Sequence, residues 1–210
     1  MLLRSRSMIL ALSLTSGAVL LPGADLWAQE KESAVKKVEE GKAAATQAIT
    51  LADGKLLLKA PAEWKAVPPK SQIVQFEFAA PASEAKADNQ ARITVMGAGG
   101  SIADNISRWY AQFEQPDGSA TKDKSKAEKL EVAGQTIHLV DIPGTFKDSG
   151  GGPFFQQRPP VMRENYRMLG AIIETKDMGQ HFLKITGPAA TVEKLKDGFR
   201  KMLDGLEVKK

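Results

Sequence analysis

Residues 170–203 read GAIIETKDMGQHFLKITGPAATVEKLKDGFRKML, and this stretch decides the fold. Two apolar runs, 170–174 and 181–187, flank the turn-forming residues 175–180, a pattern that predicts an antiparallel hairpin. The period then changes from that of a strand to that of a helix. One apolar stripe follows at helical spacing, formed by Val192, Leu195, Phe199, Met202 and Leu206. A hairpin followed by an amphipathic helix predicts a helix that packs on an antiparallel sheet.

The rest of the chain repeats this combination. Residues 101–113 place apolar side chains on one helical face and begin with Ser101, a favoured N-cap. Two further hairpins are predicted, one around Asp53 and Gly54 and one around residues 133–135. Further strands are predicted at residues 71–80 and 91–98. Because hairpins join antiparallel neighbours, we expect an α+β fold with one antiparallel sheet and helices packed against it.

The N-terminus has the pattern of a signal peptide. Arg4 and Arg6 precede an apolar run at residues 8–21, which is too short to span a bilayer of about 30 Å. Cleavage after Ala28 predicts a signal peptide at residues 1–28. A charged, alanine-rich spacer is then expected at 29–48 and a single domain at 49–210. We expect an exported protein, periplasmic or extracellular, without stable membrane insertion of the mature chain.

Composition excludes several kinds of chemistry. There is no cysteine, so disulfides, thiolate catalysis and cysteine-based zinc sites are impossible. The formal net charge of +4 is small and the lysines alternate with acids, so nucleic acid is not an expected partner. No cofactor motif or metal-ligand spacing is present, and we expect neither a cofactor nor a metal. The sequence indicates no reaction.

The order of elements resembles the PsbP-like fold, which includes the extrinsic subunit of photosystem II and a small Ran-binding import factor. The segment APAEWKAVPP at 60–69 resembles the family's opening, and residues 170–203 resemble its closing hairpin and helix. The segment GTFKDSGGGPF at 144–154 also resembles secreted bacterial proteins of this fold. The resemblance covers about residues 55–206. It implies a non-catalytic module that binds or assists another protein, with no family site residue carried over.

The segment KDSGGGPFFQQRPP at 147–160 raises three hypotheses: a phosphate loop, an oxyanion hole or a long irregular loop. A phosphate loop needs a lysine after its glycines, and an oxyanion hole of this kind needs a G-x-S-x-G nucleophile. These glycines are followed by proline and phenylalanine instead of lysine, and the chain contains no G-x-S-x-G. We therefore expect a loop over residues 143–165. Its candidate binding residues are Phe154, Phe155, Arg158 and Arg163. The two phenylalanines either cover the sheet or face a protein partner, and our hypothesis is one ring in each role.

Three further features have alternative interpretations. The glycines of MGAGGSIADN at 96–105 either bind an anion at a helix N-terminus or turn the chain tightly, and the second is favoured because Asp104 would repel an anion. The lysine-rich segment at 121–129 is expected to be an exposed loop. The alternative function is an enzyme or metal-binding protein, which would require the fold to bring His138, His181 and an acid such as Glu174 together.

Overall fold

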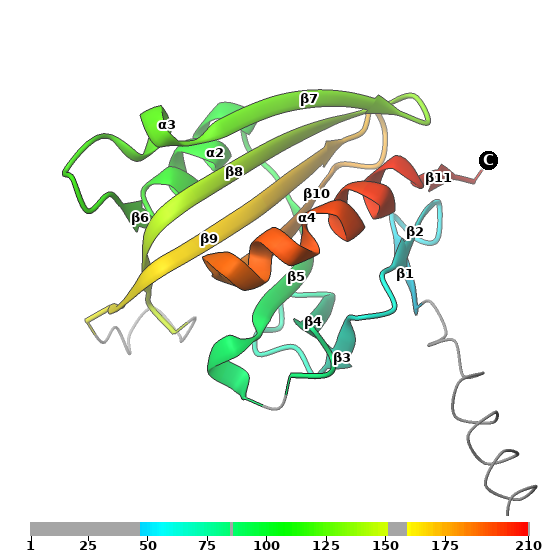
Figure 1. Ribbon diagram of the computed structural model, residues 1–210. Coiled ribbons are helices and arrows are strands. Elements are labelled where there is room, and N and C mark those ends of the chain that lie inside the picture. Colours follow the sequence, from blue (N-terminus) through cyan, green and yellow to red (C-terminus); the bar gives the residue numbers. More distant parts are fainter. Residues whose placement is uncertain (1–46, 85, 151–158, 210) are drawn as a thin grey trace, which may run out of the picture. The chain divides into compact units, whose positions relative to one another are not determined.

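Most strands belong to one antiparallel sheet in the order β3-β4-β5-β10-β9-β8-β6, and β7 also pairs with β8 (Figure 1). Its strands are β3 (Lys65–Val67), β4 (Phe76–Ala80), β5 (Ala91–Ala98), β6 (Phe113–Glu114), β7 (Lys126–Val132), β8 (Gln135–Asp148), β9 (Val161–Glu174) and β10 (Gln180–Pro188). A smaller antiparallel sheet consists of β1 (Gln47–Leu51), β2 (Leu56–Ala60) and β11 (Glu207–Val208). The computed structural model describes residues 47–84, 86–150 and 159–209.

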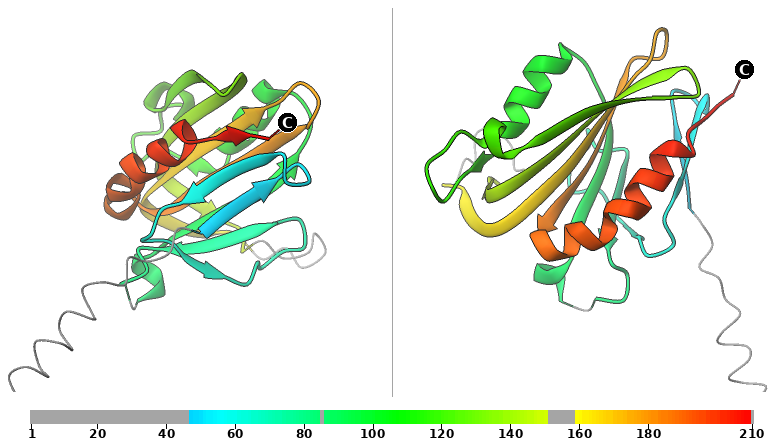
Figure 2. Two further views of the ribbon diagram at one scale, coloured as in Figure 1. Left: turned by 90° about the vertical axis from the view of Figure 1, so that its right-hand side faces the viewer. Right: turned by 45° about the horizontal axis from the view of Figure 1, so that its top comes forward.

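Two helices cover opposite faces of the large sheet. They are α2 (Ile102–Tyr110) and α4 (Ala189–Asp204), and Figure 2 shows the sheet between them. Two short helical segments, η1 (Ala87–Asn89) and α3 (Thr121–Lys124), lie in connections. The predicted α+β architecture, an antiparallel sheet with helices packed against it, is confirmed.

The larger core lies between the sheet and α4. The predicted apolar stripe of α4 is buried, together with every second residue of β9 and β10 on the same face. Trp64 is 2% exposed, and its ring centroid lies 5.6 Å from that of Phe78 and 6.4 Å from that of Phe199. The small sheet contributes Ile49, Leu56 and other side chains to this core. One apolar stripe of α4 therefore holds both sheets together.

The second core lies under α2 on the other face. Trp109 packs against Phe182 with ring centroids 5.2 Å apart in an edge-on arrangement. The indole also lies directly over Gly170, where an added Cβ would collide with the ring. Gly170 is thus the position that lets α2 approach the centre of β9.

The glycines before α2 turn the chain from strand into helix. Gly100 has φ +87°, a conformation that suits glycine, and the side chain of Ser101 accepts a hydrogen bond from the N–H of Asp104 at 3.0 Å. The Asn105 side-chain amide donates to the carbonyl of Gly99 at 3.0 Å. These contacts support the turn interpretation of this motif and confirm the predicted N-cap.

Two predictions of irregular structure are wrong. The described part of the expected loop at 143–165 is mostly strand, because β8 extends to Asp148 and β9 begins at Val161. A bulge between Gly144 and Phe146 absorbs the break in pattern, and Gly144 has φ +138°. The lysine-rich segment at 121–129 is α3 followed by the first half of β7, although most of its side chains are exposed as expected. The end of β8 pairs with the start of β9, and β7 pairs with β8, and these contacts are not visible in either segment alone.

Candidate functional site

The two histidines point to opposite faces of the sheet. His138 lies opposite Ile172 of β9, on the α2 face, whereas His181 lies opposite Ile173, on the α4 face. His138 does meet Glu174, with Nε2 2.8 Å from a carboxylate oxygen. The sheet therefore brings His138 and Glu174 together. It keeps His181, the third residue that the alternative function requires, on the other face.

His181 is buried in a setting that disfavours its charged form. Its Nε2 lies 3.1 Å from the carbonyl oxygen of Met178, and its Nδ1 has no hydrogen-bond partner among the described residues. Burial lowers the pKa of His181, and the contact with the Met178 carbonyl offsets this only in part. Within the part of the chain that the structure describes, no group of three or more His, Asp or Glu side chains could hold a metal ion. The histidines consequently form no shared acid–base or metal site.

Of the four residues predicted to bind a partner, Phe154, Phe155 and Arg158 lie outside the described residues. Arg163 lies near the start of β9, where its Nε is 3.4 Å from a carboxylate oxygen of Asp148. Arg163 is thus engaged by an acid of the adjoining strand. The neighbouring Val161 and Met162 are 55% and 43% exposed. These two apolar side chains were not identified from the sequence, because they follow two prolines in a segment expected to be a loop.

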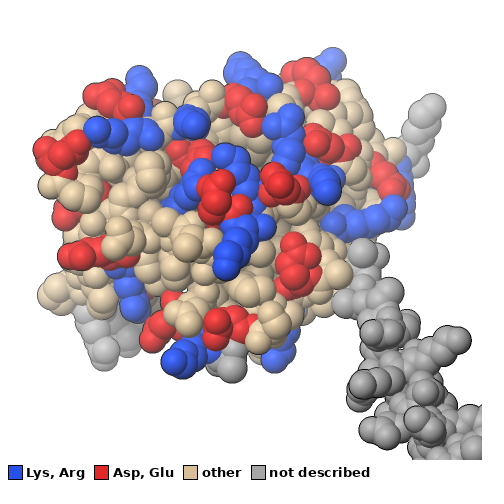
Figure 3. Space-filling view, in the orientation of Figure 1, with Lys and Arg blue, Asp and Glu red and all other residues tan. Residues whose placement is uncertain are grey.

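A groove lies between α4 and the strands β7 and β8. Its volume is about 540 Å³. The lining comprises Lys126, Ala127, Glu128, Leu139, Val140, Asp141, Leu169, Lys196, Asp197, Phe199 and Arg200. The apolar side chains come from the sheet and from Phe199, and the charged side chains come from the two rims. Figure 3 shows both signs of charge interspersed over this face of the domain.

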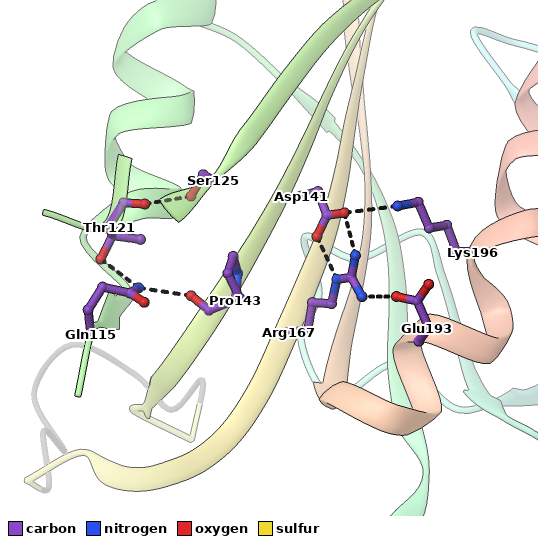
Figure 4. A network of polar contacts seen from close by, with 8 residues as sticks. All are labelled: Gln115, Thr121, Ser125, Asp141, Pro143, Arg167, Glu193 and Lys196. Atoms are coloured by element: carbon purple, nitrogen blue, oxygen red, sulfur yellow. Dashed lines mark hydrogen bonds and ion pairs between the residues drawn. The ribbon is translucent and has the colours of Figure 1, made fainter. Parts of the chain in front are cut away.

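Ion pairs tie α4 to the sheet beside this groove. Arg167 of β9 donates to the two carboxylate oxygens of Asp141 of β8 from Nε and one terminal nitrogen, each at 2.6 Å, and its other terminal nitrogen contacts Glu193 of α4. Lys196 of α4 lies 3.2 Å from the second oxygen of Asp141, and Figure 4 shows the four side chains converging. Farther along the helix, Arg200 donates to Glu128 of β7 at 2.9 Å. The two sides of the groove are therefore connected at both positions.

The central carboxylate of this cluster remains charged despite partial burial. Burial by itself would raise the pKa of Asp141, but its hydrogen bonds and attraction to Arg167, followed by those to Lys196, outweigh that effect and lower the pKa. A partly buried pair with bidentate geometry is stronger than an exposed one. The cluster is thus a fixed feature that positions α4, and the groove beside it keeps its width.

The groove was not predicted from the sequence. Its residues come from four separate segments of the chain, and the alternating charges of β7 are typical of a solvated surface. The one local signal is Asp141, an acid within an otherwise apolar run of β8. Such a residue indicates a buried partner, but the identity of that partner depends on the packing of α4.

Comparison with known proteins finds similar structures but no similar sequence. No family model matches the chain, and no curated protein matches its sequence. Cyanobacterial PsbP from Synechocystis sp. PCC 6803 has 13% identity, covering 79% of this chain and 94% of its own, with a TM-score of 0.47. LpqN, involved in cell envelope biogenesis of Mycobacterium tuberculosis, has 9% identity, covering 78% and 90%, with a TM-score of 0.44. A protein of unknown function from Pseudomonas aeruginosa has 13% identity, covering 79% and 98%, with a TM-score of 0.41. A similarity to PsbP was expected from the sequence, and PsbP is among the structures found.

Proposed function

We propose that this protein is an exported, non-catalytic accessory module that binds another protein through the groove between α4 and β7. The observation that carries the proposal is the combination of an apolar floor with charged rims in a groove of about 540 Å³. Concave sites that are mostly apolar with a few placed polar groups are the usual binding sites of proteins. Leu139 and Phe199 supply the floor of this one.

The charges on the rim define the chemistry of the partner. Glu128, Asp141, Lys196 and Arg200 are already neutralised by pairs inside the domain. Lys126 and Asp197 line the groove and make no ion pair with the described residues. We therefore propose a partner segment that offers an acidic residue to Lys126, a basic residue to Asp197 and an apolar side chain to the floor between them.

The exposed edge of β7 favours an extended segment. Within the described residues β7 pairs with β8 alone, so its outer backbone groups make no strand pairing. Extended peptides commonly bind by adding a strand to such an edge. Because the ion pairs of α4 preform the groove, little ordering of this domain would accompany binding. The mixed charges of this surface do not favour nucleic acid as the partner.

Export remains part of the proposal. Residues 1–28 carry the signal pattern, and the mature chain would begin near Gln29 and act in the periplasm or outside the cell. The spacer proposed at residues 29–48 lies almost wholly outside the described residues, and β1 begins at Gln47. Along residues 47–84, 86–150 and 159–209, no helix is both long and apolar enough to cross a membrane. N-terminal sequencing of the protein from its own host would test the proposed cleavage site.

Site-specific photocrosslinking tests the groove. A photoreactive phenylalanine analogue replaces the exposed Ala127 in the groove, and the matched control carries it at Lys65, an exposed position on β3. We expect a discrete protein adduct from the groove position alone. The purified adduct partner should then bind the Lys126→Glu variant about tenfold more weakly, since rim charges set specificity and association. Equal adducts from both positions, or unchanged binding by the variant, would exclude the groove as the binding site.

A further inference from the structure

A second feature lies on the opposite face of the sheet, away from the groove. Lys184 occupies the middle of β10, where its neighbours are Thr94 of β5 and Gly170 of β9. Its side chain lies on the α2 face. The ammonium nitrogen lies 5.6 Å from the centre of the Trp109 ring, and it donates a hydrogen bond to the Gln112 side chain at 3.0 Å. A lysine is thus held, partly buried, near the centre of an eight-stranded sheet.

No carboxylate of the described residues neutralises this lysine. Among the described residues Lys184 makes no ion pair. The nearby acid on this face, Glu77, is buried. It already accepts hydrogen bonds from Nε and Nη2 of Arg92, at 2.7 and 2.9 Å, and from the N–H of Lys70 at 2.9 Å. Burial of a charge is unfavourable unless an opposite charge compensates it. The Lys184 ammonium is hydrogen-bonded to Gln112, but it has no carboxylate partner among the described residues.

The surrounding side chains form a polar square. Lys184 lies opposite Thr94, and two residues along the same strands Thr186 lies opposite Arg92. The two cations thus occupy one diagonal and the two threonines the other, on adjacent central strands. Side chains directly opposite in such a ladder have Cβ atoms about 5 Å apart, and diagonal ones about 7–8 Å. Neither threonine hydroxyl makes a hydrogen bond within the described part of the chain. The Lys184 ammonium and the two threonine hydroxyls are therefore donors on one patch of the sheet, and the Arg92 head group beside them is bound by Glu77.

We propose that this square binds the carboxylate of a small organic monoanion, through the Lys184 ammonium and the two threonine hydroxyls. The charge balance favours a single negative charge, because Glu77 already matches Arg92 and leaves only the charge of Lys184. This site is separate from the proposed protein-binding groove, since the sheet lies between them.

Titration of the full-length protein with benzoate tests the proposal, with benzamide as the neutral analogue of the same shape. Binding is measured by calorimetry, and the Lys184 side chain is followed by NMR through its ¹³Cε signal, identified by its loss in Lys184→Met. We expect saturable benzoate binding that moves this signal. Benzamide, and benzoate with Lys184→Met, should each bind at least about tenfold more weakly, the usual effect of removing a charge-assisted hydrogen bond. The matched control, Lys129→Met on exposed β7, should bind benzoate as the unchanged protein does.

Two further arms keep the test decisive. Thr186→Val retains the lysine and removes one donor, so weaker benzoate binding by this folded variant would support the square even if Lys184→Met did not fold. Inorganic phosphate is titrated in parallel, and tighter binding of phosphate than of benzoate would overturn the monocarboxylate assignment. Absence of saturable benzoate binding, equal binding of benzamide, or unchanged binding by Lys184→Met in a folded protein would each overturn the proposal.

Discussion

Replacement of Lys184 by methionine should stabilise the protein at neutral pH, and the gain should disappear in alkali. Burial, followed by repulsion from Arg92, lowers the pKa of Lys184 from 10.5 to about 8. The folded state therefore releases its proton more readily than the unfolded chain, and at pH 7 holding the charge inside opposes folding. Methionine is apolar and of similar length, so it can occupy the same space without that charge.

The size of the effect follows from the two pKa values. Lowering the pKa from 10.5 to about 8 corresponds to about 3 kcal/mol of destabilisation at pH 7. Between these two values the unfolded chain binds more protons than the folded one, so the stability of the unchanged protein rises with pH through that window. Lys184→Met lacks this titration. The lost hydrogen bond to Gln112, about 1 kcal/mol, reduces the net gain at pH 7 to about 2 kcal/mol.

Urea denaturation at pH 7 and pH 10.5 measures the charge effect directly. The lost packing and hydrogen bonding are the same at both values, so the change in the difference between variant and unchanged protein isolates the charge. We expect that change to be about 3 kcal/mol for Lys184→Met, and within roughly 0.5 kcal/mol for the exposed control Lys129→Met. If the Lys184 variant changes no more than the control, the ammonium is not buried without compensation, and the reasoning from its missing partner fails.

Three further sets of variants test the packing under α2, the buried histidine and the two phenylalanines of the segment at 147–160. Gly170→Ala should destabilise the fold by about 1–3 kcal/mol in urea denaturation, because its methyl group would collide with the overlying indole, whereas Gly97→Ala on β5 meets open space and should have a much smaller effect. The lowered pKa of the buried His181 makes stability fall as the pH drops below about 6.5 toward the folded pKa. His181→Gln should remove this loss, and melting curves from pH 7 to pH 5 would detect the difference. Thermal melts of Phe154→Ala and Phe155→Ala test the hypothesis of one buried and one exposed ring; a large loss of stability, about 3–5 kcal/mol, in both variants would contradict it.

Local periodicity was sufficient to predict the elements whose partners are close in sequence. The stripe of α4 needs only its own spacing, and the hairpin joining β7 to β8 is marked by Ala133 and Gly134, both with positive φ in the structure. The paired strands around residues 143–165 were missed because Pro143 and Gly144 interrupt the alternation. Their pairing with β9 and the bulge after Gly144 restore the ladder, and no short window of sequence carries that information.

The candidate sites were harder to predict for a related reason. In the segment HFLKITG, Lys184 has the position of a polar residue in an alternating strand, which normally indicates a solvated face. Its burial depends on Trp109 and Gln112, which come from a different part of the chain. The histidine hypothesis failed similarly, because the parity of β8 and β10 relative to β9 decides which face each ring occupies. Residue type was visible in the sequence, but the face and the neighbours were not.

The charged side chains differ in their pairing on the two faces of the sheet, and this difference bears on the function of each face. On the α4 face, Asp141 and Arg167 neutralise each other, so their contribution is mainly the position of the helix and the shape of the groove. On the α2 face, Glu77 and Arg92 do the same for each other, but Lys184 has no such partner within the described part of the chain and stays partly accessible. A charge that is held rigidly and left unmatched is more easily explained by a ligand than by stability, because folding alone would favour an apolar residue there. The proposed protein-binding groove and the proposed anion site at Lys184 therefore rest on separate observations. Refutation of one proposal leaves the evidence for the other unchanged.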